Sequence, residues 1–415
     1  MARNDPLKKV TSQSVSRPRI ALFTHDTFGL GHIKRSSHII QALSERLPNA
    51  SLLLISGSPV LHMLRTLPPN ADYVKIPTVV KTGAPESQPS HLPLAVSEIT
   101  WLREQIILQT VQGFGPDVFV ADNFPLGSGN ELLSTLKELK RSNARTILGV
   151  RDIVDAPEVV RVDWQRHGIY DVLDRYYDRI LVYGNREMFD VADAYAIPDR
   201  ISRKIAYCGY LTSPAQMERN PEEIHQELGT HDRMIVVTGG GGGDAFPLFS
   251  TFLEALPRLS GFSALLVLGP MMGASDRAKL HSLAAGNPNV ILRDSVPDLP
   301  RYMIAAEAVV SMCGYNVAAE IVVNRLRAVI VPRTWRYGEH TNRANTLAEG
   351  EQIIRAQSFA KMGLALLLEP ENLNPEHLAE KILEAIRSPK PAISAGLNVD
   401  GLESAVKLIQ EMVCT

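Results

Sequence analysis

Cysteine is scarce in this sequence, and the three that occur, Cys208, Cys313 and Cys414, lie far apart. An odd number at such spacing fits neither a disulfide framework nor a four-ligand zinc site, so a reducing cytoplasm is the expected compartment. Long hydrophobic runs are missing as well, because none reaches the roughly 18 apolar residues that span a bilayer. Residues 1–18 are polar and lack the apolar core of a signal peptide. We expect a cytoplasmic protein, with peripheral contact to a membrane left open.

Net charge is nearly absent, since 43 Lys and Arg stand against 45 Asp and Glu, for a formal charge of −2. This balance gives no global field that would attract nucleic acid, so we expect no nucleic-acid partner. Any anion that the protein binds must be held by local groups.

The length of 415 residues, with 45% hydrophobic and 21% charged residues, favours a globular protein of two domains. We predict a disordered tail over residues 1–17, a first domain over 18–210 and a second over 211–395. Residues 396–415 are predicted to form a closing helix that packs back on the first domain, because apolar residues recur at helical spacing from Gly401 to Met412.

Short apolar segments alternate with longer helical patterns along both domains, which predicts an α/β fold with parallel sheets. The expected strands of the first domain are Arg19–Thr24, Ser51–Ser56, Asp117–Asp122, Thr146–Val150 and Arg179–Tyr183. Those of the second domain are Arg233–Thr238, Ala264–Leu268, Val290–Leu292, Ala308–Ser311 and Ala328–Val331. Two Rossmann-like domains in tandem follow, and ligands of such folds bind at the carboxyl ends of the strands.

The first strand is followed by a glycine loop, Gly29-Leu-Gly31-His32, and then by a helix. A dinucleotide fingerprint is disfavoured because Lys34 occupies the position of its third glycine. His32 lies where an imidazole could accept a proton from a bound hydroxyl, although it could equally hydrogen-bond the loop.

Asp122 ends another predicted strand of the first domain, on the same side of the sheet as His32. Its carboxylate could orient the imidazole of His32 and stabilise the charged form, as in other base-assisted attacks. The alternative is that Asp122 caps the helix that follows.

Five consecutive glycines, Gly239–Gly243, follow the first strand of the second domain. Such a run costs backbone entropy and offers no side chain to pack, so we interpret it as a loop that approaches a phosphate or a sugar.

The most informative segment runs from Ser311 to Glu320 and continues at Pro332 with Arg333. Gly314 begins a strand-to-helix turn whose free amides could bind a diphosphate. Glu320, about two turns along the helix, could accept hydrogen bonds from ribose hydroxyls, although a lone glutamate more often lies on a solvated helix face.

Together, the Gly-Leu-Gly-His loop, the glycine run, Ser-x-x-Gly-Tyr-Asn-x-x-Ala-Glu and the later Glu-His-x-x-Arg-Ala resemble a GT-B glycosyltransferase of family 28, the type that makes the lipid-linked disaccharide of peptidoglycan. The match covers most of the chain from Arg19 to about Leu368 and is more specific in the second domain. Glu339-His340 and Tyr315-Asn316 depart from that pattern, which leaves the sugar and the acceptor open.

The resemblance implies a UDP-sugar donor in the second domain and an acceptor, small or lipid-linked, in the first. By similarity, the base would meet the backbone of Val296 and the ribose would meet Glu320. The same similarity assigns the diphosphate to Gly240, Gly241 and Gly242 with the turn Gly314, Tyr315, Asn316 and Val317, and the hexose to Glu339 and His340.

The chain has no Asp-x-Asp triplet, the usual site of a divalent ion that holds a sugar diphosphate, so we expect no metal and no other cofactor. Helix amides and the candidates Arg333 and Arg343 would then offset the charge of the leaving group. The expected reaction is an inverting displacement in which His32, supported by Asp122, deprotonates the acceptor hydroxyl.

Two alternatives remain: a UDP-sugar epimerase or hydrolase of the same fold, for which Asp122, Glu131 and Asp152 would supply carboxylates, and a non-catalytic nucleotide-sugar-binding protein. Two further segments bear on the acceptor. Arg151 or Asp152 is expected to border the cleft and meet the acceptor. An apolar helical stripe beginning at Trp101 is interpreted as core packing, with membrane contact as the alternative.

Overall fold

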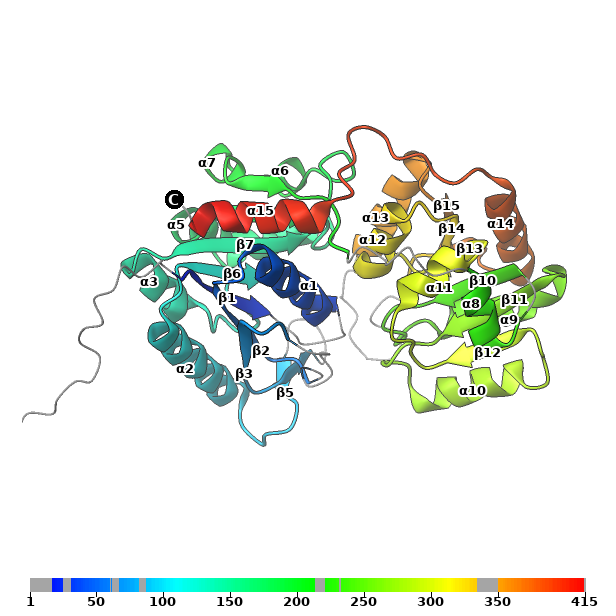
Figure 1. Cartoon of the computed structure of the whole chain (residues 1–415), viewed down its shortest axis with the longest axis horizontal. Helices are drawn as coiled ribbons and strands as arrows, with labels where there is room; N and C mark the ends of the chain where they lie inside the picture. The colour runs from blue at the N-terminus through cyan, green and yellow to red at the C-terminus, as the bar shows by residue number, and fades with distance from the viewer. Residues whose placement is uncertain are drawn as a thin grey trace, which may run out of the picture.

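A computed structural model describes residues 17–24, 31–59, 61, 67–81, 87–212, 221–230, 233–333 and 350–413. The chain forms two α/β domains that lie side by side, each built on a parallel sheet (Figure 1). This confirms the predicted fold class. Most of the predicted tail, residues 1–16, lies outside the described residues.

The first domain contains a seven-stranded parallel sheet in the order β3-β2-β1-β6-β7-β8-β9. Its strands are β1 (Arg19–Thr24), β2 (Ser51–Ser56), β3 (Ala71–Lys75), β6 (Val118–Asp122), β7 (Arg145–Arg151), β8 (Arg179–Tyr183) and β9 (Ile205–Tyr207). Its helices are α1 (Gly31–Arg46), α2 (Val96–Phe114), α3 (Leu133–Arg141), α4 (Pro157–Arg166), α5 (Ile169–Tyr176), α6 (Val191–Ala194) and α7 (Asp199–Ser202), and β4 (Val79–Lys81) pairs with β5 (Ser87–Pro89) in a hairpin. The strand order reverses between β1 and β6, so the carboxyl ends of these two strands border a crevice.

The second domain repeats the plan with a six-stranded parallel sheet in the order β12-β11-β10-β13-β14-β15. Its strands are β10 (Arg233–Thr238), β11 (Phe262–Val267), β12 (Val290–Arg293), β13 (Ala308–Ser311), β14 (Ala328–Ile330) and β15 (Leu366–Leu367). Its helices are α8 (Pro221–Leu228), α9 (Phe246–Ala255), α10 (Ala274–Ala284), α11 (Leu299–Ala305), α12 (Tyr315–Val323), α13 (Glu351–Lys361) and α14 (Pro375–Arg387), with 3₁₀ turns η2 (Leu256–Arg258) and η3 (Pro370–Asn372). Here the order reverses between β10 and β13, which places the glycine run and α12 at the corresponding crevice.

The last helix, α15 (Gly401–Val413), returns to the first domain and lies along α1, as Figure 1 shows in red. Ala405, Val406 and Ile409 are fully buried there. The start of α15 packs closely on the segment that follows β9, because a Cβ on Gly401 would lie 2.3 Å from the carbonyl oxygen of Tyr210. The predicted closing helix on the first domain is confirmed.

In the two parallel sheets, the strands that the sequence failed to indicate are β3, β9 and β15, which all lie at sheet edges; the hairpin strands β4 and β5 were not predicted either. An edge strand buries fewer side chains than a central one, and every residue of these three is at least partly exposed. A search for apolar runs therefore finds central strands such as β11, which is buried throughout, and of the edge strands it finds β12 but misses these three.

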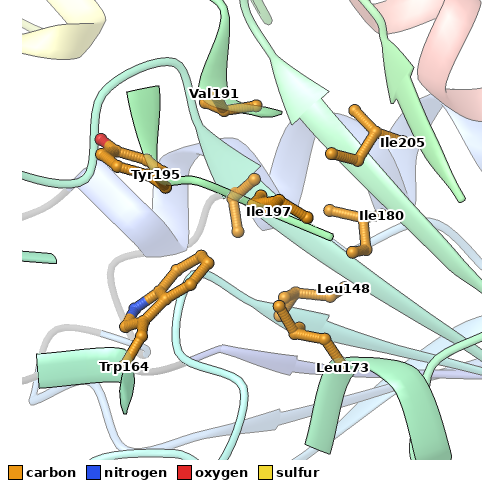
Figure 2. Close-up of a pocket in the computed structure, with 9 residues that line it drawn as sticks. Leu148, Trp164, Leu173, Ile180, Val191, Tyr195, Ile197 and Ile205 are labelled. Carbon is orange, nitrogen blue, oxygen red and sulfur yellow. The ribbon is translucent and has the colours of Figure 1, made fainter. Parts of the chain in front are cut away.

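A small cavity lies inside the first domain between the sheet and α4 and α5 (Figure 2). Apolar side chains line it, including Leu148, Trp164 and Ile180. The one lining hydroxyl, on Tyr195, already donates to the carbonyl of Asp155 and accepts from the amide of Val154. The cavity contains none of the residues that the sequence singled out for chemistry.

No described helix is both long enough and apolar enough to cross a membrane.

Candidate active site between the domains

His32 lies in the first turn of α1, and Asp122 is the last residue of β6. Because β1 and β6 are neighbours, the two side chains meet at the carboxyl edge of the sheet. His32 Nδ1 lies 2.5 Å from Asp122 Oδ2. A hydrogen bond of this kind places the proton of a neutral imidazole on Nδ1 and leaves the lone pair on Nε2, which is the form of a general base.

Arg35 completes this cluster, and the sequence analysis missed it. Its Nε and Nη2 atoms donate to Asp122 Oδ1 at 3.0 and 2.7 Å, and the side chain is fully buried. Burial alone would raise the pKa of Asp122, but the charges of Arg35 and His32 and their hydrogen bonds lower it to about 2. Asp122 is therefore ionised throughout the physiological range and holds the imidazole in place.

Arg35 also reaches the second domain. Its guanidinium lies 5.4 Å from the ring of Tyr183, which ends β8, and 5.4 Å from the ring of Tyr315, which begins α12. A guanidinium between two aromatic faces is a favourable arrangement. The residue that binds Asp122 thus also contacts the turn for which the sequence predicted a diphosphate site.

The N-terminus of α12 supplies backbone amides rather than side chains. Gly314 has extended backbone angles at the N-cap position, and in the described part of the chain no side chain caps the first turn. The side chains of Tyr315 and Val317 are buried, so these residues offer a ligand only their backbone. Uncapped amides at a helix N-terminus attract anions such as phosphate.

The turn before α12 has a strained residue, Cys313, whose φ of 62° lies in the left-handed region. Arg355 Nη1 from α13 donates to the carbonyl of Cys313 at 2.8 Å. The same guanidinium forms two hydrogen bonds of 2.8 Å to Asp152 of the first domain. An ion pair between the domains therefore supports the backbone of this turn.

Asp152 lies at the domain interface, but it is one of two residues predicted to meet an acceptor and it is not available to do so. Asp152 is 1% exposed and bound by Arg355 and by the hydroxyl of Tyr210. Its neighbour Arg151 pairs with Glu351 of α13 at 2.9 Å. Both residues follow a strand, as the sequence indicated, but they join the domains because the second domain packs against this edge.

The glycine run lies between β10 and α9, and part of it is explained by packing. A Cβ on Gly242 would lie 1.9 Å from the carbonyl oxygen of Leu268, and its φ is 87°. A Cβ on Gly239 would lie 2.2 Å from the Cβ of Ala245. The interpretation that the run has no packing role is therefore wrong at these two positions. Among the described residues, nothing lies within 4 Å of a Cβ on Gly240, and only Met271 lies within 4 Å of a Cβ on Gly241.

Glu320 does not lie on a solvated helix face, which was the alternative for this residue. It is 4% exposed, and its Oε1 lies 2.7 Å from Lys34 Nζ of α1. Burial raises the pKa of the Glu320 carboxyl, while Lys34 opposes that shift. Val296, the predicted partner of a base, lies in the loop between β12 and α11 and packs on the adjoining core.

Of the two arginines predicted to offset the charge of the leaving group, the structure describes only Arg333. Arg333 follows β14, and its Nε lies 2.5 Å from Asp244 Oδ2, next to the glycine run. Arg343, Glu339 and His340 lie outside the described residues, so their positions stay a prediction. No group of three or more potential metal-ligating side chains occurs within the described ranges.

Residues 234–411 match the glycosyltransferase family 28 C-terminal domain. This match covers most of the second domain and extends into α15. The resemblance predicted from the sequence is thereby confirmed for this half of the chain.

A curated relative supports the same family. The UDP-N-acetylglucosamine–N-acetylmuramyl-(pentapeptide) pyrophosphoryl-undecaprenol N-acetylglucosamine transferase of Anaeromyxobacter sp. is 26% identical over 270 residues, which cover 62% of this chain and 65% of that protein. The enzyme of the same name from Syntrophotalea carbinolica is 26% identical over 187 residues. The chain thus matches between about half and 65% of the length of these two relatives.

Solved structures extend the likeness in fold to both domains. Acinetobacter baumannii MurG superposes with a TM-score of 0.57 at 13% identity, covering 95% of this chain and 99% of that one. A Listeria monocytogenes protein assigned as a UDP-N-acetylglucosamine 2-epimerase superposes with a TM-score of 0.61 at 12% identity, covering 96% of each chain. At these identities the likeness shows the fold alone, which is that of GT-B proteins.

Three residues of the site escaped the sequence analysis: Arg35, Lys34 and Arg355. Arg35 follows His32 by three positions, and residues three apart lie on one face of a helix, so this spacing could have indicated it. Lys34 and Arg355 act across the domain interface. Their partners are 286 and 203 positions away in the chain, and no local pattern indicates such pairs.

Proposed function

We propose that the protein transfers a hexose from a UDP-sugar to a hydroxyl acceptor, with His32 as the general base and inversion at the anomeric carbon. The observation that carries the proposal is the His32–Asp122 hydrogen bond of 2.5 Å at the carboxyl edge of the first sheet, near the first turn of α12, which no side chain of the described residues caps. The family 28 match of the second domain and the names of the relatives support the UDP-sugar donor.

The proposed chemistry is a single displacement. His32 Nε2 takes the proton from the acceptor hydroxyl as its oxygen forms a bond to the anomeric carbon. The bond between that carbon and the diphosphate oxygen breaks, and UDP leaves with the electron pair. Asp122 stabilises the imidazolium that forms, and its low pKa keeps it charged while it does so.

We propose that the backbone at Gly240, Gly241 and Gly242 and at Gly314, Tyr315, Asn316 and Val317 holds the diphosphate, that Glu320 holds the ribose and that Val296 meets the base. Backbone amides suit this task because they are fixed before the ligand arrives. Glu339, His340 and Arg343 would complete the hexose and leaving-group contacts. A divalent metal is not needed in this proposal, so chelation with EDTA is expected to leave the rate unchanged.

The acceptor that we propose is a hydroxyl compound, lipid-linked in analogy to the relatives' names, used at the cytoplasmic face of a membrane. The chain offers an apolar surface for such contact, because Trp101 is 62% exposed and Leu92, Leu94 and Val96 are exposed nearby in sequence. Other members of the same stripe, Ile107 and Val111, belong to the core. Sedimentation with phosphatidylglycerol vesicles tests this contact, and Trp101→Ser together with Val96→Ser should reduce it.

A thermal-shift panel of UDP, GDP, dTDP, NAD and their sugar conjugates tests the donor, because a ligand that binds only the folded state raises the melting temperature. Stabilisation by UDP and its sugars is expected. Stabilisation by NAD alone, or by none of these compounds, would overturn the proposal.

His32→Ala tests the base once a donor and an acceptor are known. The expected loss in kcat is about 10²- to 10⁴-fold, with UDP affinity unchanged. His167→Ala, an exposed histidine on the far end of α4, is the matched control and should retain the full rate. Conversion of the donor sugar in the absence of any acceptor would favour the epimerase or hydrolase instead, and UDP-sugar binding without turnover would favour a non-catalytic protein.

A further inference from the structure

Lys34 forms an ion pair across the domain interface with a carboxylate that the proposed donor would need. Its ammonium group lies 2.7 Å from Glu320 Oε1, and Glu320 is nearly inaccessible to solvent. A buried carboxylate is costly without a cation or hydrogen-bond donors around it. In the donor-free protein, Lys34 meets this need.

The first turn of α1 directly abuts the first turn of α12. A Cβ on Gly31 would lie 3.1 Å from Asn316 Nδ2, so backbone and side chain are in contact here. Lys34 and Glu320 line one small hollow between the domains together with Arg35, His38 and Asn316. The ammonium group therefore lies in a hollow that α12 borders with Asn316 of its first turn and with Glu320 further along the helix.

The three basic side chains of this hollow are not equivalent. Arg35 is buried and bound to Asp122 through several hydrogen bonds. Burial, together with the charge of Lys34, lowers the pKa of His38 to about 4, so His38 is neutral at pH 7. Lys34 carries a charge on a flexible side chain that is 41% exposed. Of the basic groups at this hollow, Lys34 is the one that can change partner at low cost.

We propose that Lys34 is a further donor-binding residue. Lys34 pairs with Glu320 when no donor is bound. When the ribose hydroxyls of a donor bind Glu320, the Lys34 ammonium group pairs with the diphosphate instead. This inference rests on the proposed function. Both partners of the exchange are anionic, and ribose hydroxyls satisfy the Glu320 carboxylate as donors. The first domain thereby supplies a positive charge next to the leaving group, where charge develops as UDP departs.

Because of this exchange, Lys34 should weaken the binding of the nucleoside and strengthen the binding of the diphosphate. For the nucleoside, Lys34 is a competitor for Glu320. For the diphosphate, it is a binding partner through a charge-assisted hydrogen bond. A role of Lys34 that is only structural would change both affinities alike.

The test is to measure dissociation constants of uridine and UDP by calorimetry for the wild type, Lys34→Met, Lys34→Arg and the control Lys361→Met. Lys361 is exposed at the end of α13, so the control makes the same charge change away from the hollow. We expect the dissociation constant of uridine divided by that of UDP to fall about tenfold in Lys34→Met. The reason is that UDP loses a charge-assisted contact, which contributes roughly that factor. Lys34→Arg and Lys361→Met should keep the wild-type ratio.

An unchanged ratio in Lys34→Met, with UDP still bound by the wild type, overturns the role of Lys34 and leaves the proposed donor intact. A wild type that binds neither uridine nor UDP overturns the donor, and the role of Lys34 with it. Ionic strength gives a second measurement that needs no variant. Raising the salt concentration should weaken UDP binding more than uridine binding, and equal responses would contradict the exchange.

Discussion

Two of the ion pairs that join the domains differ in their access to solvent. The side chains of Asp152 and Arg355 are 2% and 0% exposed, and three further groups bind them: Tyr210, the carbonyl of Cys313 and Glu351. Lys34 and Glu320 are 41% and 5% exposed, and one contact of 2.7 Å joins them. The first pair fixes one side of the interface, while the second can be exchanged for a ligand. Domain closure is typically absorbed at a few positions while the rest of an interface stays fixed, and we refer to the buried pair as the pivot because it is the more constrained of the two.

The largest effect is expected for Asp152→Asn, which leaves the charge of Arg355 buried without its main partner. Breaking a buried pair in this way costs about 3–5 kcal/mol of unfolding free energy. Chemical denaturation measures the loss. Asp276→Asn, in an exposed pair with Lys279, is the matched control and should lose less than about 1 kcal/mol. Equal losses in the two variants would show that burial does not distinguish the pairs.

A second experiment uses Asp122 and Arg35, a buried ion pair that lies within one domain and so does not join the two domains. The pKa of Asp122 is lowered from 3.8 to about 2. Its contribution of about 2 kcal/mol is therefore complete above pH 4 and is lost as the pH falls toward 2. The difference in unfolding free energy between the wild type and Asp122→Asn should shrink over this range. A difference that stays constant with pH would contradict the assigned pKa.

Tyr210→Phe should have a smaller effect, since it removes one hydrogen bond of 2.8 Å to Asp152 and leaves Arg355 in place. We expect a loss of about 1 kcal/mol in unfolding free energy. Tyr73→Phe, at an exposed position in β3, controls for the loss of a hydroxyl. If Tyr210→Phe were as stable as this control, Tyr210 would not contribute to the pivot.

The smallest effect is expected for Lys34→Met in the absence of ligand. The Lys34 side chain is 41% exposed, and Glu320, whose pKa is raised by burial, can bind a proton when Lys34 is removed, so the loss should stay below about 1 kcal/mol and should decrease further with added salt. Thermal denaturation at two salt concentrations measures it. A loss as large as that of Asp152→Asn would mean that Lys34 is a structural residue and not an exchangeable one.

Much of the fold could be predicted because central parallel strands are buried on both faces. Strands β1, β2, β8, β10 and β13 have the predicted bounds, and β6, β7, β11, β12 and β14 differ from them by two residues or fewer at an end. The edge strands β3, β9 and β15 were missed because they are short or carry polar residues and so form no apolar run, whereas the edge strand β12 was found from its apolar residues. Helix α15 was predicted from its period, since one face of it is buried on the first domain.

The candidate site likewise has a part that the sequence could predict and a part that it could not. His32, Asp122 and the turn at Gly314 follow strands, and the topology of parallel sheets brings the ends of neighbouring strands together, so the sequence indicated their proximity. Asp152 also follows a strand, yet it faces Arg355 of the other domain. A strand end specifies which edge a residue occupies, and it does not specify what packs against that edge.

The sequence by itself determined two parallel-sheet domains, the motifs at their crevices and the likeness of the second domain to family 28. The tertiary structure alone decided how buried charges are compensated: Asp122 by Arg35, Asp152 by Arg355 and Glu320 by Lys34. The physical reason is that a buried charge needs a partner nearby in space, and only the packing of helices and domains decides which residue is close enough to serve.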